Sequence, residues 1–219
     1  MKFIFIFEII NHFIIFANII FEDIPTIPEL LQKLGLSRYL MDPSKVSKES
    51  LERIAVHECG HAIVEHILFP GLSQMKVSIK MDPYSYGRMS CHVGLNPTEL
   101  QLMGDIAVCF GGRNAERLIY GDHCVGCAGD YEDAKKTAKD MIEKYAMGSY
   151  LDPDGVIRIL DAADRFATQI LQENELALRR LSKILMTQKV IDLGIVSMIV
   201  KSSKAETEEA IDKKEENQT

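Results

Sequence analysis

The stretch AVHECGHAIVEHIL, residues 55–68, is the part of the sequence that most clearly indicates both the fold class and the chemistry. It lies in a helical pattern that begins after Ser47, a favourable N-cap residue, and stops at Pro70. His57 and His61 are four residues apart, one turn along the same helix face, so both imidazoles can reach a single metal ion. An H-E-x-x-H pattern on a helix therefore predicts a zinc site.

Glu58 lies about 100° around the helix axis from His57, which sets it apart from the two imidazoles. From there it can hold a water molecule in the open metal position and act as its general base. Gly60 leaves one side of the helix bare, where a neighbouring element can approach. The alternative is a buried histidine pair neutralised by nearby carboxylates, but the helical context favours zinc.

A zinc ion held by two histidines needs a third protein ligand. The same helix does not supply a histidine, because Val64 stands three residues beyond His61, and His66 lies about 140° around the axis from it. From the residues alone, four candidates elsewhere in the chain stay open. They are Glu116, His123, Asp130 and Asp133.

The remaining pattern is mainly helical. Two short strands are expected at residues 75–81 and 88–93 around a turn. Further helices are expected from an N-cap at Asn96 to Tyr120, from an N-cap at Asp130 to Gly148, and from Asp161 to about Lys189. The predicted fold class is therefore mainly α, a helical domain with a small β-hairpin.

The N-terminal end is unusually apolar. Of the nineteen residues 3–21, fifteen are apolar, close to the roughly 20 that a membrane-spanning helix needs. The polar exceptions fall in one stripe, which favours a membrane helix that packs against partners over an extension that docks on the globular domain. The chain thus divides into a hydrophobic segment and membrane anchor (1–21), a proline-containing linker (22–46), the main domain (47–200) and a disordered charged tail (201–219).

Composition excludes some function classes. The net charge of −7 disfavours a nucleic-acid binder. No glycine is followed by lysine, so there is no phosphate-binding loop of the G-x-x-x-x-G-K-[ST] type and no ATP binding is expected. Five cysteines indicate free thiols in a reducing compartment, on the cytosolic side of a membrane or, alternatively, in the cytoplasm.

Three blocks beyond the histidine helix carry a family resemblance: GGRNAERLIYG (111–121), GCAGD (126–130) and YAMG (145–148). In this order and spacing the chain resembles the peptidase domain of the FtsH-type ATP-dependent zinc metalloproteases, from about Ser47 to Leu193. The resemblance implies a mainly helical peptidase domain that assembles as hexameric rings. It also implies that residues 87–93 form the edge strand that receives an extended substrate.

The resemblance further implies the roles of the site residues. His57 and His61 would bind zinc, Glu58 would be the general base, and Asp130 would be the third ligand. A carboxylate at a helix N-terminus is held ionised by the helix dipole, which agrees with that role.

The loop before Asp130 departs from the family. The family usually has Thr-Thr-Gly-Ala-Ser-Asn there, whereas this chain has Cys124-Val-Gly-Cys127-Ala-Gly. Cys127 or His123 could therefore compete as a metal ligand. The family's second glutamate in the Gly-Gly-Arg block is Arg117 here.

The leading hypothesis is a zinc endopeptidase that cleaves unfolded or membrane-proximal polypeptides without an ATPase of its own, either as a homo-oligomer or with a separate ATPase partner. One alternative is a non-catalytic, membrane-anchored adaptor subunit. Another is a redox-gated peptidase in which Cys124 and Cys127 form a disulfide near the site.

Overall fold

The computed structural model describes residues 46–71, 76–79, 96–148 and 152–216. Contacts divide the chain into two compact units, and the described residues from Ser47 onward belong to the second, which comprises Ser47–Lys80 and Gly87–Thr219. Its described part is mainly α, as predicted. The elements are α3 (Lys48–Leu68), β1 (Lys76–Ser78), α4 (Glu99–Tyr120), the 3-10 turn η3 (Val125–Cys127), α5 (Ala128–Glu143), α6 (Gly155–Glu173), α7 (Glu175–Gln188), β2 (Val190–Asp192) and α8 (Leu193–Glu216).

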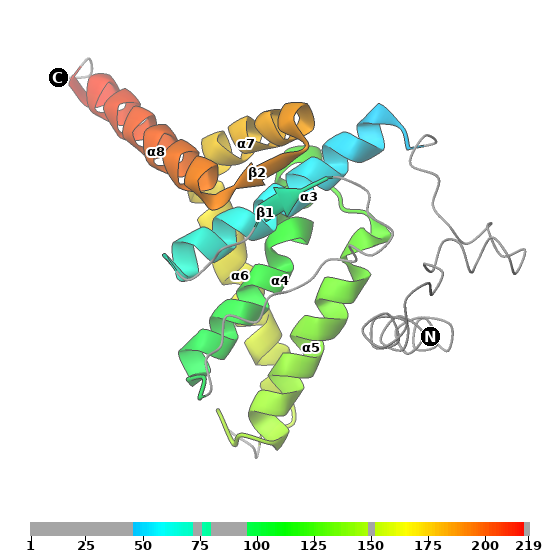
Figure 1. Ribbon diagram of the computed structural model, residues 1–219. Helices are drawn as coiled ribbons and strands as arrows, with labels where there is room; N and C mark the ends of the chain where they lie inside the picture. The colour runs from blue at the N-terminus through cyan, green and yellow to red at the C-terminus, as the bar shows by residue number, and fades with distance from the viewer. Residues whose placement is uncertain (1–45, 72–75, 80–95, 149–151, 217–219) are drawn as a thin grey trace, which may run out of the picture. The chain divides into compact units, whose positions relative to one another are not determined.

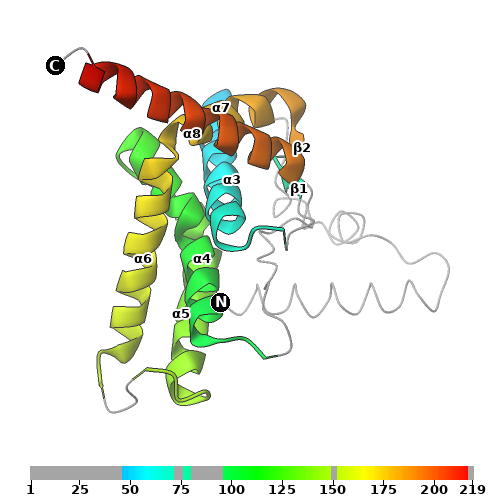
Figure 2. The same ribbon diagram turned by 90° about the vertical axis from the view of Figure 1, so that its left-hand side faces the viewer.

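Helix α4 is the centre of this unit. It packs against α3, α5 and α6, while α7 covers α3 and α8 packs against both α3 and α7 (Figure 1). Turned by 90°, α4, α5 and α6 run side by side below α7 and α8 (Figure 2). Fully buried side chains from five helices fill the space between them, each contributing about 1.5–3 kcal/mol to stability. They include Ile63, Ile106, Met141, Leu171, Leu178, Leu181 and Leu185.

The boundaries of α3 are those that the sequence predicts. The Ser47 hydroxyl accepts a hydrogen bond from the Ser50 backbone N–H at 3.1 Å, which satisfies one of the unpaired donors of the first turn. The helix ends at Leu68, and the Phe69 N–H still donates to the Glu65 carbonyl before Pro70 follows.

Helices α4 and α5 begin elsewhere than expected. The N-cap of α4 is Thr98, not Asn96, because Thr98 and Gln101 form a reciprocal capping box: each side chain accepts a hydrogen bond from the other residue's backbone N–H. Helix α5 has Cys127 as its N-cap, so Asp130 lies inside the first turn instead of capping it.

The last predicted helix is in fact two helices, α6 and α7, which meet at Asn174. The Asn174 backbone N–H donates to the carbonyls of Ile170 and Leu171, and its side-chain amide donates to Ile170 at 2.8 Å. The bond to Leu171 spans three residues instead of four and occupies the carbonyl that Glu175 would pair with in a continuing helix, so α6 ends there.

The charged C-terminal residues are helical in the structure, where the sequence predicts a disordered tail. Helix α8 continues to Glu216. Arg180 of α7 binds both carboxylate oxygens of Glu206, at 2.8 and 2.7 Å, and Ser203 is buried beneath that pair. Composition alone signals disorder, but these contacts with α7 anchor α8 as far as Glu206.

The two-stranded sheet joins distant parts of the chain. β1 pairs antiparallel with β2, with Val77 opposite Ile191, so its observed partner follows α7 instead of the expected turn. The second predicted strand at residues 88–93, including the proposed substrate edge, lies outside the described residues.

The predicted membrane anchor and linker, residues 1–21 and 22–46, also lie outside the described residues, apart from Val46. Among the helices that the structure does describe, none is long and apolar enough to cross a membrane.

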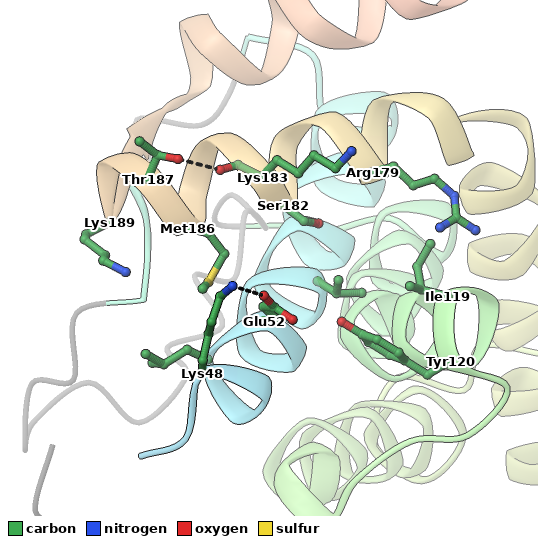
Figure 3. Close-up of a pocket in the computed structure, with 12 residues that line it drawn as sticks. Lys48, Glu52, Ile119, Tyr120, Arg179, Ser182, Lys183, Met186, Thr187 and Lys189 are labelled. Atoms are coloured by element: carbon green, nitrogen blue, oxygen red, sulfur yellow. Dashed lines mark hydrogen bonds and ion pairs between the residues drawn. The ribbon is translucent and has the colours of Figure 1, made fainter. Parts of the chain in front are cut away.

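A groove of about 760 Å³ lies between α3, the end of α4 and α7. Figure 3 shows Lys48 and Glu52 of α3 on one side, Met186 and Lys183 of α7 along another, and Tyr120 at the end of α4. None of the candidate metal ligands lines this groove, which is therefore a feature separate from the histidine helix.

Helices α3 and α4 approach each other closely where they cross. A Cβ atom built on Gly60 would lie 2.4 Å from the carbonyl oxygen of Gly111 and 2.5 Å from the Cβ of Ala115. A Cβ on Gly111 would likewise lie 2.9 Å from backbone atoms of Gly60 and His61. The two backbones therefore touch, and only glycine permits this approach at both positions.

Gly60→Ala should separate α3 from α4. We expect the free energy of unfolding to fall by about 3 kcal/mol, because the methyl group meets backbone atoms that cannot move aside. Urea unfolding followed by circular dichroism measures this. Gly129→Ala is the matched control, since a Cβ there meets nothing within 4 Å and a helical alanine gains at most about 1 kcal/mol. Equal stability of Gly60→Ala and the unaltered protein would contradict the close-contact argument.

Candidate active site

The α3–α4 crossing brings His61 against the backbone of α4. Its Nδ1 lies 2.6 Å from the carbonyl oxygen of Val108. A carbonyl only accepts hydrogen bonds, so Nδ1 carries the proton and donates it. In neutral His61, Nε2 then presents its lone pair on the opposite side of the ring, which is the arrangement of a metal-binding histidine.

His57 is held in the same way by a carboxylate. Its Nδ1 donates to Oε1 of the buried Glu116 at 2.8 Å. A Cβ on Gly112 would lie 2.4 Å from Nε2 of His57, so the absent side chain is what makes room for the ring. The Nε2 atoms of His57 and His61 consequently face each other at 3.0 Å.

Glu116 is itself fixed from two further sides. The Cys124 backbone N–H donates to its Oε2 at 3.0 Å, and Arg53 approaches the same oxygen at 3.5 Å. Burial opposes ionisation of Glu116, but the hydrogen bonds from His57 and Cys124 outweigh it and hold its pKa below the usual value. Glu116 is thus an ionised carboxylate that orients His57.

Asp130 reaches the histidine pair from the first turn of α5. Its Oδ2 lies 3.2 Å from Nε2 of His57 and 3.4 Å from Nε2 of His61. In a tetrahedral zinc site with bonds of about 2.0–2.1 Å, ligand atoms are about 3.3–3.4 Å apart. The three separations of 3.0, 3.2 and 3.4 Å come close to this spacing, so these residues fit a tetrahedral ion with one open position.

The electrostatics of this group require a positive charge at its centre. The two Nε2 lone pairs and the Asp130 carboxylate converge where little water reaches them. Burial disfavours protonation of His57, but Asp130 and Glu116 overcome it and raise the pKa of His57 to about 9. Burial likewise opposes ionisation of Asp130, yet its bonds to both histidines lower its pKa well below the usual value. A proton on His57 or a metal ion can supply the charge.

Glu58 is half-buried on α3, next to His57. Against the effect of burial, and together with Asp130 and Glu116, its negative charge raises the pKa of His57. The helix directs Glu58 about 100° away from His57 around the axis, and Glu58 is not among the three side chains that converge.

Among the described residues, His57, His61 and Asp130 are the group of donor side chains close enough to share one metal ion, with ligand atoms within 4.8 Å of one another. The other candidates from the sequence, His123, Asp133 and Cys127, are not in it. Glu116 does not join this group either, because it contacts Nδ1 of His57, the ring nitrogen that points away from the converging atoms.

Two groups that support the site, the Val108 carbonyl and the Arg53 side chain, cannot be identified from the sequence. The Val108 carbonyl belongs to the backbone and has no residue signature. Arg53 stands one turn before His57 on α3, and its two ion pairs with Glu116 and Asp122 become visible only once α3 lies against α4.

The chain is similar in sequence to proteins described as zinc metalloproteases. The sequence profile described as Peptidase family M41 matches residues 44–216. The chain is 34% identical over 125 residues to "ATP-dependent zinc metalloprotease FtsH 2" of Sphaerobacter thermophilus, covering 52% of this chain and 19% of that protein. It is 27% identical over 203 residues to "ATP-dependent zinc metalloprotease FtsH" of Veillonella parvula, covering 75% and 31%.

The human protein "ATP-dependent zinc metalloprotease YME1L1" is 27% identical over 227 residues, covering 91% of this chain and 29% of its own length. The chain thus spans 16–31% of the length of the curated relatives described as FtsH or YME1L1. The family profile covers most of the chain and includes all three converging side chains, so this protein belongs to peptidase family M41.

Proposed function

We propose that this chain is a zinc-dependent endopeptidase domain. The observation that carries the proposal is the convergence of His57 Nε2, His61 Nε2 and Asp130 Oδ2 at separations of 3.0–3.4 Å. Two nitrogens and one oxygen suit zinc, and three protein ligands leave a fourth position for a substrate or water. When bound, zinc would supply a Lewis acid that activates water and polarises the scissile carbonyl.

The chain's own residues perform the proton transfers and the positioning. Glu58 accepts a proton from the attacking water and later donates it to the leaving amine. Glu116 and the Val108 carbonyl keep the Nδ1 protons of His57 and His61 in place, so that both Nε2 atoms stay directed at the metal. This support fixes the ligands before the substrate arrives.

The substrates are unfolded or membrane-proximal polypeptides. These 219 residues contain no phosphate-binding loop, so in this proposal they cleave the polypeptide without hydrolysing ATP themselves. A homo-oligomer, a membrane attachment through residues 1–21 and a peptidase domain on the cytosolic side complete the proposal, each motivated by the sequence alone.

Glu58→Gln tests the catalytic claim. The variant should keep its zinc but lose about 100- to 10,000-fold of its activity on casein or unfolded peptides, because general-base catalysis is worth that much. Metal content and cleavage rate are measured together. Glu52→Gln, an exposed change on the same helix, should behave like the unaltered protein. If the unaltered protein binds one zinc ion and is as inert as Glu58→Gln, the endopeptidase claim fails and the adaptor alternative gains.

Asp130→Asn tests the third ligand. Loss of a residue that merely supports a ligand already costs about 10- to 100-fold in metal affinity, so loss of a ligand should cost on the order of 100-fold or more. Competition with a chromophoric chelator measures the dissociation constant. Asp133→Asn, one turn further along α5 and exposed, is the matched control. Unchanged zinc affinity in Asp130→Asn would remove Asp130 from the proposed site.

The pH dependence of stability tests the exchange of proton for metal. The pKa of His57 is about 9 in the metal-free folded state and about 6.5 when unfolded, so the folded state binds more protons between these values. Stability of metal-free protein should therefore be complete below about pH 6.5 and fall by up to about 3 kcal/mol as the pH rises to 9. Despite burial, the hydrogen bonds from the histidines lower the pKa of Asp130 and of Glu116, so these two carboxylates do not contribute to the fall.

Saturating zinc should abolish that fall, since the ion replaces the proton on His57. Urea unfolding across pH 6–9.5, with chelator or with zinc, measures both curves, and His57→Gln should flatten the metal-free curve. Metal-free stability that stays level or rises over this range would contradict the electrostatic account of the site.

A further inference from the structure

We propose that Cys124 and Cys127 form a reversible disulfide that weakens metal binding at the adjacent site. This inference rests on the proposed function, because it concerns regulation of the same metal site. It goes beyond that function by assigning a redox modification to the loop where this chain departs from the family pattern.

The backbone places the two thiols within bonding reach. Cys124 is the N-cap residue of the 3-10 turn η3, and Cys127 is the last residue of that turn. A tight turn of this kind keeps the Cα atoms of its first and fourth residues within about 7 Å, and disulfides need about 4.4–6.8 Å. The Cys127 thiol already folds back onto the turn, donating to the Cys124 carbonyl at 3.2 Å.

Accessibility singles out this pair among the described cysteines. Cys124 is exposed and Cys127 is partly exposed, whereas Cys59 and Cys109 are 0% and 1% exposed. An oxidant in solution therefore reaches Cys124 first, and Cys127 is the neighbouring thiol that can complete the bond.

Both cysteines are connected to the metal-binding group. On one side, the Cys124 thiol lies 3.5 Å from Oε1 of Glu116, the same oxygen that accepts the His57 proton, and the Cys124 N–H donates to Oε2. On the other side, Cys127 is the N-cap of α5, three residues before Asp130. The turn thus links the carboxylate that orients His57 to the helix that carries Asp130.

The oxidation balances with a peroxide as the oxidant. The sulfur of Cys124 attacks one peroxide oxygen, the O–O bond breaks, and a sulfenic acid and one water form. The sulfur of Cys127 then attacks the sulfenic sulfur, the S–S bond forms, and a second water leaves with the remaining proton. Two thiols are oxidised by two electrons and one peroxide is reduced. A dithiol reductant reverses the bond by exchange.

Closing the disulfide disturbs both supports of the metal. The Cys124 sulfur loses its proton and can no longer donate to Glu116, and it must turn toward Cys127. The same pull acts on the first turn of α5. Changes to residues that support metal ligands cost about 10- to 100-fold in affinity, so we expect the oxidised protein to bind zinc at least about 10-fold more weakly.

The test compares reduced and oxidised protein, both with Cys91→Ser so that this residue outside the described part cannot compete. Metal-free protein is treated with stoichiometric hydrogen peroxide, and peptide mapping with intact mass looks for a 2 Da loss at residues 124–127. Zinc affinity is then measured by chelator competition before and after a dithiol reductant. We expect the mapped bond, weaker zinc binding, and recovery on reduction.

Cys127→Ser is the matched control, because serine keeps a donor at that position but cannot form the bond. Peroxide can still convert its Cys124 to the sulfenic acid, so this variant isolates that step, and its zinc affinity should fall by clearly less than that of the disulfide-bonded protein. Absence of the bond, or a mapped bond with unchanged zinc affinity, overturns the proposal and leaves the endopeptidase function standing. Reduced protein that binds no zinc contradicts the proposed function itself, a result that needs no oxidant and is thereby distinguishable.

Discussion

The contact between the backbones of α3 and α4 at Gly60 and Gly111 is the constraint on which the site depends. Without it, His61 could not reach the Val108 carbonyl, 2.6 Å from its Nδ1, and its ring would be free to rotate. In the same way, the absence of a side chain on Gly112 leaves the space that the His57 ring occupies. Close helix packing is therefore more than a source of stability here: it sets which nitrogen of each imidazole points inward, and so which atoms can bind a metal.

The side chains around His57 carry more negative charge than a protein interior tolerates without compensation. Asp130 and Glu116 place two carboxylates on opposite nitrogens of His57, and Arg53 at 3.5 Å offsets only part of the charge of Glu116. Removing this much negative charge from water is unfavourable unless a positive species accompanies it. In the metal-free protein, a proton on His57 supplies this positive charge. A divalent ion supplies it as well, and it also offers an open coordination position. In the absence of metal, the attraction between the carboxylates and the proton on His57 stabilises the site, and a bound zinc ion would replace that attraction with its own.

The sequence reveals what is local and misses what is tertiary. The H-E-x-x-H spacing, the Ser47 cap and the stop before Pro70 all follow from one helix, and the structure has them. Asp130 lies 73 residues beyond His57, so no periodicity connects them, and only the family resemblance selected it among four candidates. The break at Asn174 and the helical course of α8 depend on side-chain bonds to Ile170 and Glu206 that composition cannot express.

The loop between α4 and α5 links two residues that shape the metal site. It connects Glu116, near the end of α4, to Asp130, in the first turn of α5, through fewer than fifteen residues. A change in its conformation must therefore act on a ligand and on the support of another ligand together. In this chain, two accessible thiols stand in that loop, and the disulfide proposed for them would change metal affinity while leaving the ligands themselves untouched.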